Sequence, residues 1–169
     1  TLHNGIDVNG KQVGLKTGDP RNFRSFDELY EAFLKQHQHI CHKVLWLGGV
    51  AREVQPNYLR LPLLSILGIE ASMDLGQDLL FAHPDYSMFG ISDRAIIDVA
   101  DSLTAIKKIV YEKKIMTMDE LLQALDSNFA GEHGEEVRQL CLAQPKYGND
   151  IAEADEMAKR VSRDSAGII

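Results

Sequence analysis

The residues best suited to chemistry lie close together between positions 37 and 42. His37, His39, Cys41 and His42 are all potential metal ligands. The i, i+4 spacing places His37 and Cys41 on one face of a helix, whereas His39 and His42 lie on another. A structural zinc site needs about four converging ligands, and one helical turn cannot aim all of these side chains at one point. The pattern favours a histidine-rich helix surface, and we predict no metal site.

Cys41 and Cys141 are the two cysteines of the chain and therefore the candidates for a nucleophile. Each is flanked by at least one aliphatic residue. A free cysteine usually behaves as a small buried hydrophobic residue, and this interpretation is favoured for both. Two cysteines make no disulfide framework, which is typical of a protein in the reducing cytoplasm.

Acidic groups between positions 93 and 101 are candidates for acid–base work. Asp98 and Asp101 lie three residues apart, and Asp93 is followed by Arg94. The interpretation we favour is structural: Asp93 and Arg94 form a local ion pair, and Asp98 caps the helix that follows.

Composition excludes several classes of protein. The chain has 169 residues, 44% of them hydrophobic, and a net charge of −7. Its Lys and Arg residues are scattered, so a nucleic-acid surface is not expected. No apolar run approaches the length of about 18 residues that a membrane helix needs, and the N-terminus lacks a signal-peptide pattern. A cytoplasmic protein with no nucleic-acid partner and no membrane span is expected.

Apolar spacing predicts a mostly helical chain. Glycines make residues 4–24 an irregular loop, after which Ser25 and Glu28 form a capping box. Pro62 is placed in the first turn of the second helical stretch, and Thr117 with Glu120 forms another capping box. The expected helices are 25–47, 58–80, 98–113, 117–129, 135–143 and 151–163, with one short buried strand at 86–92.

A single strand cannot form a sheet with itself, so its partners are expected in a larger protein. Leu2 to Gly5 has the pattern of a last helical turn, with Gly5 as its left-handed stop. The chain does not begin with Met and finishes on apolar residues. We therefore expect an interior piece of a longer polypeptide.

Two blocks of sequence resemble a known family. The first holds Asn4-Gly-Ile-Asp7, Gly10-Lys-Gln-Val-Gly14, Thr17-Gly-Asp-Pro20 and Ser25-Phe-Asp-Glu-Leu29. The second holds Asp98-Val-Ala-Asp-Ser-Leu103, Ala105-Ile-Lys-Lys108 and Pro145-Lys-Tyr-Gly-Asn-Asp150. In this order and spacing they resemble the catalytic subunit of a glycyl radical enzyme, the pyruvate formate-lyase-like family, and the resemblance covers nearly the whole chain.

The resemblance implies an α/β fold class. Residues 1–169 would be a mostly helical slice of the ten-stranded α/β barrel of these enzymes. The family's catalytic cysteine and its radical-bearing glycine would lie outside the chain, so no catalytic residue is expected within it. Arg160-Val-Ser-Arg163 approaches the radical motif, but Arg163 stands where the glycine should be. A backbone radical requires a glycine α-carbon, so this match is interpreted as coincidence.

The chain departs from many members of the family at residues 81–97. The family strand here helps to line the substrate cavity, and this chain supplies Met88, Phe89, Ile91 and Ser92, which are our candidate substrate-binding residues. An apolar lining suits a hydrocarbon, because an unpartnered hydroxyl or carboxylate is costly to desolvate. Alternatively, the three apolar side chains simply pack against an outer helix.

We therefore predict part of an alkylsuccinate or benzylsuccinate synthase, which adds a hydrocarbon to fumarate by a radical mechanism. The alternative is another glycyl radical lyase, such as an arylacetate decarboxylase, a diol dehydratase or a formate acetyltransferase-like enzyme. A third possibility, of another class, is a stand-alone helical interaction module.

The resemblance also implies partners. A separate activating enzyme with S-adenosylmethionine and a [4Fe-4S] cluster would install the radical, and no cofactor would bind this chain directly. The remainder of the catalytic subunit would surround the chain. The full subunit would form a homodimer, with small accessory subunits as a further possibility.

Overall fold

The computed structural model describes residues 1–58, 70–76 and 92–168. Its helices are η1 (Pro20–Asn22), α1 (Phe26–Tyr58), α3 (Glu70–Leu75), α4 (Ile96–Ile106), the π-helix η2 (Lys107–Glu112), α5 (Met118–Asp126), α6 (Gly134–Leu142) and α7 (Ala152–Ala166). The only β pairing in these ranges is an isolated antiparallel bridge between Ile6 and Gln12. No described helix has the length and apolar character needed to cross a membrane.

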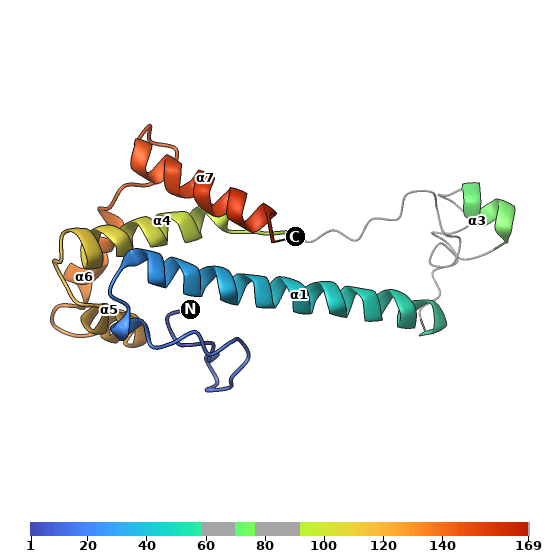
Figure 1. Cartoon of the computed structure of the whole chain (residues 1–169), viewed down its shortest axis with the longest axis horizontal. Coiled ribbons are helices and arrows are strands. Elements are labelled where there is room, and N and C mark those ends of the chain that lie inside the picture. The colour runs from blue at the N-terminus through green and yellow to red at the C-terminus, as the bar shows by residue number, and fades with distance from the viewer. Residues whose placement is uncertain (59–69, 77–91, 169) are drawn as a thin grey trace. The chain divides into compact units, whose positions relative to one another are not determined.

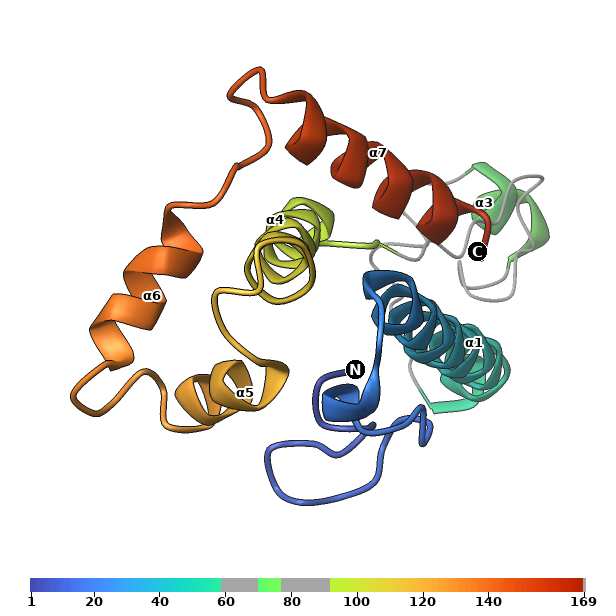
Figure 2. The same ribbon diagram turned by 60° about the vertical axis from the view of Figure 1, so that its left-hand side comes forward.

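The chain divides into two units, Thr1–Ile40 with Asp93–Ile169 and, separately, Cys41–Ser92. The first unit has its core around α4. Figures 1 and 2 both show α7 next to α4, against which it packs. The buried side chains that form this core come from α1, α4, α5 and α7: Phe26, Leu29, Tyr30, Ala100, Leu103, Met118, Leu121, Leu122, Met157, Ala158 and Val161.

The helices mostly begin and end near their predicted positions, with two corrections. The first predicted helix continues past Leu47 to Tyr58, because Gly48 and Gly49 weaken a helix without breaking it. The helix predicted from Asp98 begins at Ile96, and Ala95 is its N-cap, with a left-handed φ of 63°. Asp98 therefore lies in the first turn, and the prediction that it caps this helix is wrong.

The predicted helix caps are confirmed at one helix and only in part at another. Thr117 and Glu120 form the predicted capping box of α5, and Gly5 is left-handed as expected, with φ of 80°. At Ser25 the box is only half formed: its hydroxyl accepts from Glu28 N–H, but the Glu28 carboxylate accepts from Arg24 N–H. Within the expected helix 58–80, the described part has helix at α3, whereas Pro62 lies outside the described residues.

Gln36 of α1 holds the first sequence block in place. Its side-chain nitrogen donates to Leu15 O at 2.5 Å and to Thr17 Oγ1 at 3.0 Å, and its oxygen accepts from Leu15 N–H at 3.0 Å. A Cβ on Gly14 would collide with that same oxygen. Gly14 thus leaves room for the buried Gln36 amide, and Thr17 accepts a hydrogen bond from it.

The block is also closed on itself. Gly5 O accepts from the N–H groups of Val13 and Gly14 at 3.0 and 2.9 Å, and Asn4 Oδ1 accepts from Gly18 N–H at 2.9 Å. A Cβ on Gly5 would collide with Leu15 O. Backbone and side chain together give residues 4–18 one defined conformation without a strand ladder.

Replacing Gln36 by leucine should destabilise the protein. The change removes three hydrogen bonds and leaves backbone groups of Leu15 without their partner, at a cost of about 1–3 kcal/mol. Urea denaturation followed by circular dichroism measures it. Gln38 is exposed on the same helix, so Gln38→Leu is the matched control. Equal losses from both substitutions would contradict the role we give to Gln36.

The capping box of α5 should make stability depend on pH. The Glu120 carboxylate accepts from the backbone N–H and the hydroxyl of Thr117 at 2.7 and 2.9 Å, and these bonds lower the pKa of Glu120 below its ordinary value of 4.5. Because the pKa of Glu120 is lower in the folded than in the unfolded state, its carboxylate stabilises the fold at a pH above the ordinary pKa. This stability is lost as the pH falls through the folded pKa.

Glu120→Gln should therefore be destabilising at neutral pH, and the difference from the parent protein should vanish in acid, below the folded pKa. Thermal unfolding across the pH range measures this difference. Glu31→Gln, at an exposed position of α1, is the control. A difference that stays constant from neutral to acidic pH would show that the charge of Glu120 contributes nothing.

Candidate functional site

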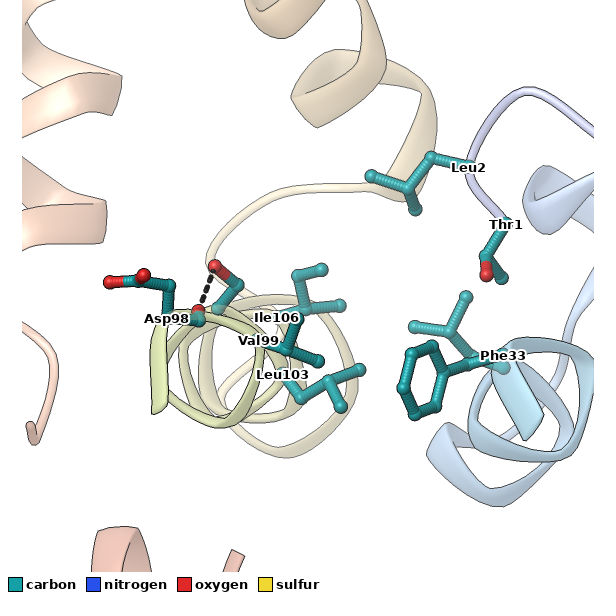
Figure 3. A pocket seen from close by; sticks show the side chains of 9 residues that line it. Thr1, Leu2, Phe33, Asp98, Val99, Leu103 and Ile106 are labelled. Atoms are coloured by element: carbon teal, nitrogen blue, oxygen red, sulfur yellow. Dashed lines mark hydrogen bonds between the residues drawn. The ribbon is translucent and has the colours of Figure 1, made fainter. Parts of the chain in front are cut away.

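An apolar pocket of about 270 Å³ opens in the first unit between the first residues of the chain, α1 and α4. Figure 3 shows Phe33 of α1 facing Val99, Leu103 and Ile106 of α4, with Thr1 and Leu2 beside them. The Asp98 side chain points away from Phe33. The full lining is Thr1, Leu2, Leu29, Phe33, Asp98, Val99, Ser102, Leu103 and Ile106.

A second pocket of about 410 Å³ also has Leu2 and Ile106 in its wall. It extends along α4 to α5 and the end of α6, and Cys141 and Lys146 lie in its lining. Leu2 thus stands between two neighbouring hollows on α4, both walled mainly by aliphatic side chains.

The first pocket suits an apolar group better than acid–base chemistry. Its lining has two hydroxyl groups, those of Thr1 and Ser102. The Ser102 hydroxyl donates to Asp98 O at 2.7 Å within α4. Aliphatic and aromatic side chains make up most of the remaining wall. A polar ligand buried there would lose water without gaining partners.

The two cysteines have the environments that the sequence favoured. Cys41 is buried, and Cys141 is partly buried. Burial raises the pKa of the Cys141 thiol, although the charge of Lys146 partly opposes it. Since the thiolate is the nucleophilic form, Cys141 is poorly suited to act as a nucleophile.

The four candidate metal ligands have different surroundings. His37 lies against α7, as described below, whereas His42 is exposed and His39 is partly exposed. Across residues 1–58, 70–76 and 92–168, no group of three or more His, Cys, Asp or Glu side chains is placed to hold a metal ion.

Asp93 contacts His37 and Ser165 rather than Arg94. His37 Nε2 lies 2.8 Å from Ser165 Oγ and 3.3 Å from Asp93 Oδ2, and the Ser165 hydroxyl donates to Asp93. The expected ion pair between Asp93 and Arg94 is absent from the described contacts. We call these three residues the His37 cluster.

The His37 cluster has the residue types of a hydrolase triad but a different geometry. In such a triad, one ring nitrogen of the histidine faces the serine and the other faces the aspartate. Here the same nitrogen, Nε2, faces both oxygens. The serine proton already points to the carboxylate, so the imidazole cannot remove it. This arrangement holds segments together instead of activating a nucleophile.

Arg160 has a structural role that explains the misleading match at residues 160–163. Its guanidinium lies 3.8 Å from the centre of the Tyr30 ring and 3.2 Å from Asp27 Oδ1. Tyr30 in turn donates to Asp164 Oδ2 at 2.9 Å, and burial, with that carboxylate, raises the pKa of its phenol. These contacts join α7 to α1.

The two halves of the second sequence block meet in space. Tyr147 N–H donates to Asp101 Oδ1 of α4 at 2.9 Å, and Gly148 N–H lies 3.4 Å from Asp155 Oδ1 of α7. The loop Pro145–Asp150 thus binds α4 through Asp101, which explains why these motifs occur together. Sequence reasoning did not find this role for Asp101.

Sequence reasoning also missed Gln36 and Ser165. Gln36 did leave a signal, since it continues the apolar stripe of Leu29 and Phe33, and a polar residue there needs a partner. Ser165 left none, because its partner His37 is 128 residues away.

The predicted substrate-binding residues lie mostly outside the described part of the chain, and their role stays a prediction. Met88, Phe89 and Ile91 lie outside the described residues, as does most of the predicted strand 86–92. Ser92 is described: it is exposed, not in a strand, and directly precedes Asp93.

Comparison with known proteins places this fold. The description Pyruvate formate lyase-like matches residues 1–169. Over 95% of its length the chain is 39% identical to trans-4-hydroxy-L-proline dehydratase from Clostridioides difficile, of which it covers 20%. Over 90% it is 35% identical to isethionate sulfite-lyase from Bilophila wadsworthia, of which it covers 18%.

A solved structure on 1,2-propanediol dehydration in Roseburia inulinivorans superposes with a TM-score of 0.85 at 32% identity, over 99% of this chain and 22% of the other. The chain thus spans about one fifth of the length of the proteins it matches. The likeness confirms the expected fold class, a mostly helical slice of the glycyl radical enzyme fold. The chain belongs to the pyruvate formate lyase-like family, the glycyl radical enzymes that its two sequence blocks resemble.

Proposed function

We propose that residues 1–169 are an interior part of the barrel domain of a glycyl radical lyase, one that eliminates water or sulfite from a small polar substrate. The observation that carries this proposal is the set of similar proteins. Their names are those of a hydroxyproline dehydratase, an isethionate sulfite-lyase and a structure on propanediol dehydration. They support the alternative that the sequence left open, another glycyl radical lyase, better than a succinate synthase.

In this proposal the chain supplies positioning rather than the reacting atoms. When installed by an S-adenosylmethionine-dependent activating enzyme, the glycyl radical outside residues 1–169 supplies hydrogen abstraction through a cysteine. The residues of this chain form part of the protein wall around the reactive groups. The apolar side chains that line the pocket between α1 and α4 are suited to pack against the rest of the subunit, and a closed apolar wall of that kind protects a radical intermediate from side reactions.

Exposed apolar side chains support a larger surrounding subunit. In the second half of α1, Trp46 is 70% exposed, Leu47 60% and Tyr58 81%. Large exposed apolar surfaces mark contacts with other protein parts. Such a surface favours the remainder of the catalytic subunit as a partner over a stand-alone helical module. A homodimer, with or without small accessory subunits, remains part of the proposal.

The full-length enzyme, activated without oxygen, tests this proposal. We expect a glycyl radical signal by electron paramagnetic resonance, followed by turnover of trans-4-hydroxy-L-proline, 1,2-propanediol or isethionate. The assay detects the dehydrated product or free sulfite. An unactivated sample is the control. An enzyme that forms the radical but converts only a hydrocarbon and fumarate would contradict elimination and favour hydrocarbon addition. Absence of the radical would contradict both reactions.

The second candidate is addition of a hydrocarbon to fumarate. The observation that favours it is the apolar character of Met88, Phe89 and Ile91 where many family members carry a glycine-rich polar strand. These residues lie outside the described structure, so this candidate depends on sequence alone.

Replacing Met88 or Phe89 by asparagine separates the two candidates further. If these side chains line a cavity for an apolar substrate, the substitutions should lower kcat/KM by about tenfold or more, because an unpartnered amide would face the substrate. The accompanying loss in free energy of unfolding should be smaller than the loss in transition-state binding that kcat/KM reports. Steady-state kinetics and thermal unfolding of the full-length enzyme measure the two effects. Comparable losses of activity and stability would favour simple packing against an outer helix.

A further inference from the structure

The amino end of the chain lies in the wall of both apolar pockets of the first unit. Thr1 and Leu2 line the smaller pocket, and Leu2 lines the larger one as well. In Figure 3 the side chain of Thr1 lies next to Phe33 of α1. A polypeptide that continues before Thr1 therefore starts its course within this apolar lining. The two pockets are contiguous, since four residues line both: Leu2, Asp98, Ser102 and Ile106.

The first residues form a single helical turn. Asn4 N–H donates to Thr1 O at 3.1 Å, and Ile6 N–H donates to His3 O at 2.9 Å. Asn4 and Gly5 have left-handed φ values of 49° and 80°. A left-handed residue after a helical turn is a common way in which a helix ends. Residues 1–4 thus have the geometry of the last turn of a helix.

The helical repeat decides which preceding side chains face the pockets. Residues three and four positions apart share one face of an α-helix. In a helix that continues backwards from this turn, the third residue before Thr1 stands three positions before Thr1 and four before Leu2. Its side chain then points at the same two pockets. The residue directly before Thr1 points away from them, because each residue turns the helix by about 100°.

Both pockets are suited to apolar side chains. They have volumes of about 270 and 410 Å³, and a cavity of about 150 Å³ already holds a benzene-sized molecule. The Asp101 carboxylate in the larger pocket is bonded to Tyr147 N–H. Burial lowers the pKa of the Thr1 amino group, since a charged amine loses its water there. A peptide bond in its place carries no charge.

We propose that the two pockets form one docking groove for the segment directly before Thr1. This segment continues the turn at residues 1–4 as an amphipathic helix, with an apolar side chain at the third residue before Thr1. The inference rests on the proposed function, in which residues 1–169 are an interior part of a longer subunit, and it names the part of that subunit that covers α4. Covalent continuity favours this occupant: the segment leaves from the groove itself, whereas a second copy of the chain or a small apolar molecule has to compete with it there.

Disulfide crosslinking in the full-length enzyme, before its activation, tests the docking. Ser102 lines both pockets, so Ser102→Cys is combined with a cysteine at the third residue before Thr1 or, as the matched control, at the residue directly before Thr1. Peptide mass spectrometry after mild oxidation measures the yield. We expect about tenfold or more crosslinking from the third residue than from the control, because a disulfide requires Cα atoms within about 7 Å of each other. Ser127→Cys, exposed at the end of α5, should crosslink with neither.

Labelling with a maleimide provides a second measurement on the same enzyme. The thiol of Ser102→Cys alone should react about tenfold or more slowly in the folded enzyme than in urea, since thiol reactivity requires access. Aspartate at the third residue before Thr1 should restore the labelling, because a carboxylate is costly to bury among apolar side chains. Aspartate at the residue directly before Thr1 should not.

The outcomes separate the docking from the function on which it rests. A Ser102→Cys thiol that reacts freely, or equal crosslinking from the third residue and its control, overturns the docking. A protected thiol without any crosslink to the preceding segment shows that another part of the subunit covers α4, and it overturns this occupant. Neither measurement uses the radical or turnover. An enzyme that fails to form the radical therefore rejects the proposed function, while the crosslinks still decide the docking.

Discussion

The close approach of α7 to α4 is the constraint on which the first unit depends. Both helices present small side chains to the core: Ala100 and Thr104 of α4 and Ala154 of α7 have no exposed surface, and Ala158 is 4% exposed. Small residues let two helix backbones come close and pack densely. The buried Thr104 hydroxyl donates to Ala100 O at 2.8 Å, so this close contact leaves no unpaired polar group there.

That contact gives a physical reading of the sequence block Asp98-Val-Ala-Asp-Ser-Leu103. Ala100 and Leu103 face the core, whereas Asp101 binds the loop Pro145–Asp150. Where α4 passes into the π-helix η2, Lys107 and Lys108 form ion pairs with Glu112 and with Glu153 of α7. Burial would raise the pKa of Glu153, but the hydrogen bonds and charges of these lysines outweigh it and lower that pKa. Residues 98–103 thus specify a packing contact and the attachment of a loop, and the two lysines that follow them in the same helical region form ion pairs with α7.

Local rules predicted what depends on neighbours in sequence. Capping chemistry located the start of α5, and apolar spacing located α6 and α7 to within a few residues. Prediction failed where distant residues decide: Ala95 caps α4 although alanine has no capping side chain, and Asp93 pairs with residues of α1 and α7 instead of Arg94. No local pattern identifies Ser165 as a partner of His37, since such a contact exists only after the helices have packed.

The polar groups of the described residues mostly bind one another. The described side chains that combine acid, base and hydroxyl, those of the His37 cluster, use their protons to hold one another. The pocket between α1 and α4 is walled by apolar groups, and its Ser102 hydroxyl is bound within its own helix. A radical enzyme needs rigid walls around its reactive groups as much as the groups themselves. In residues 1–40 and 93–168, hydrogen bonds between distant segments fix side-chain positions, and apolar side chains line the pocket between α1 and α4.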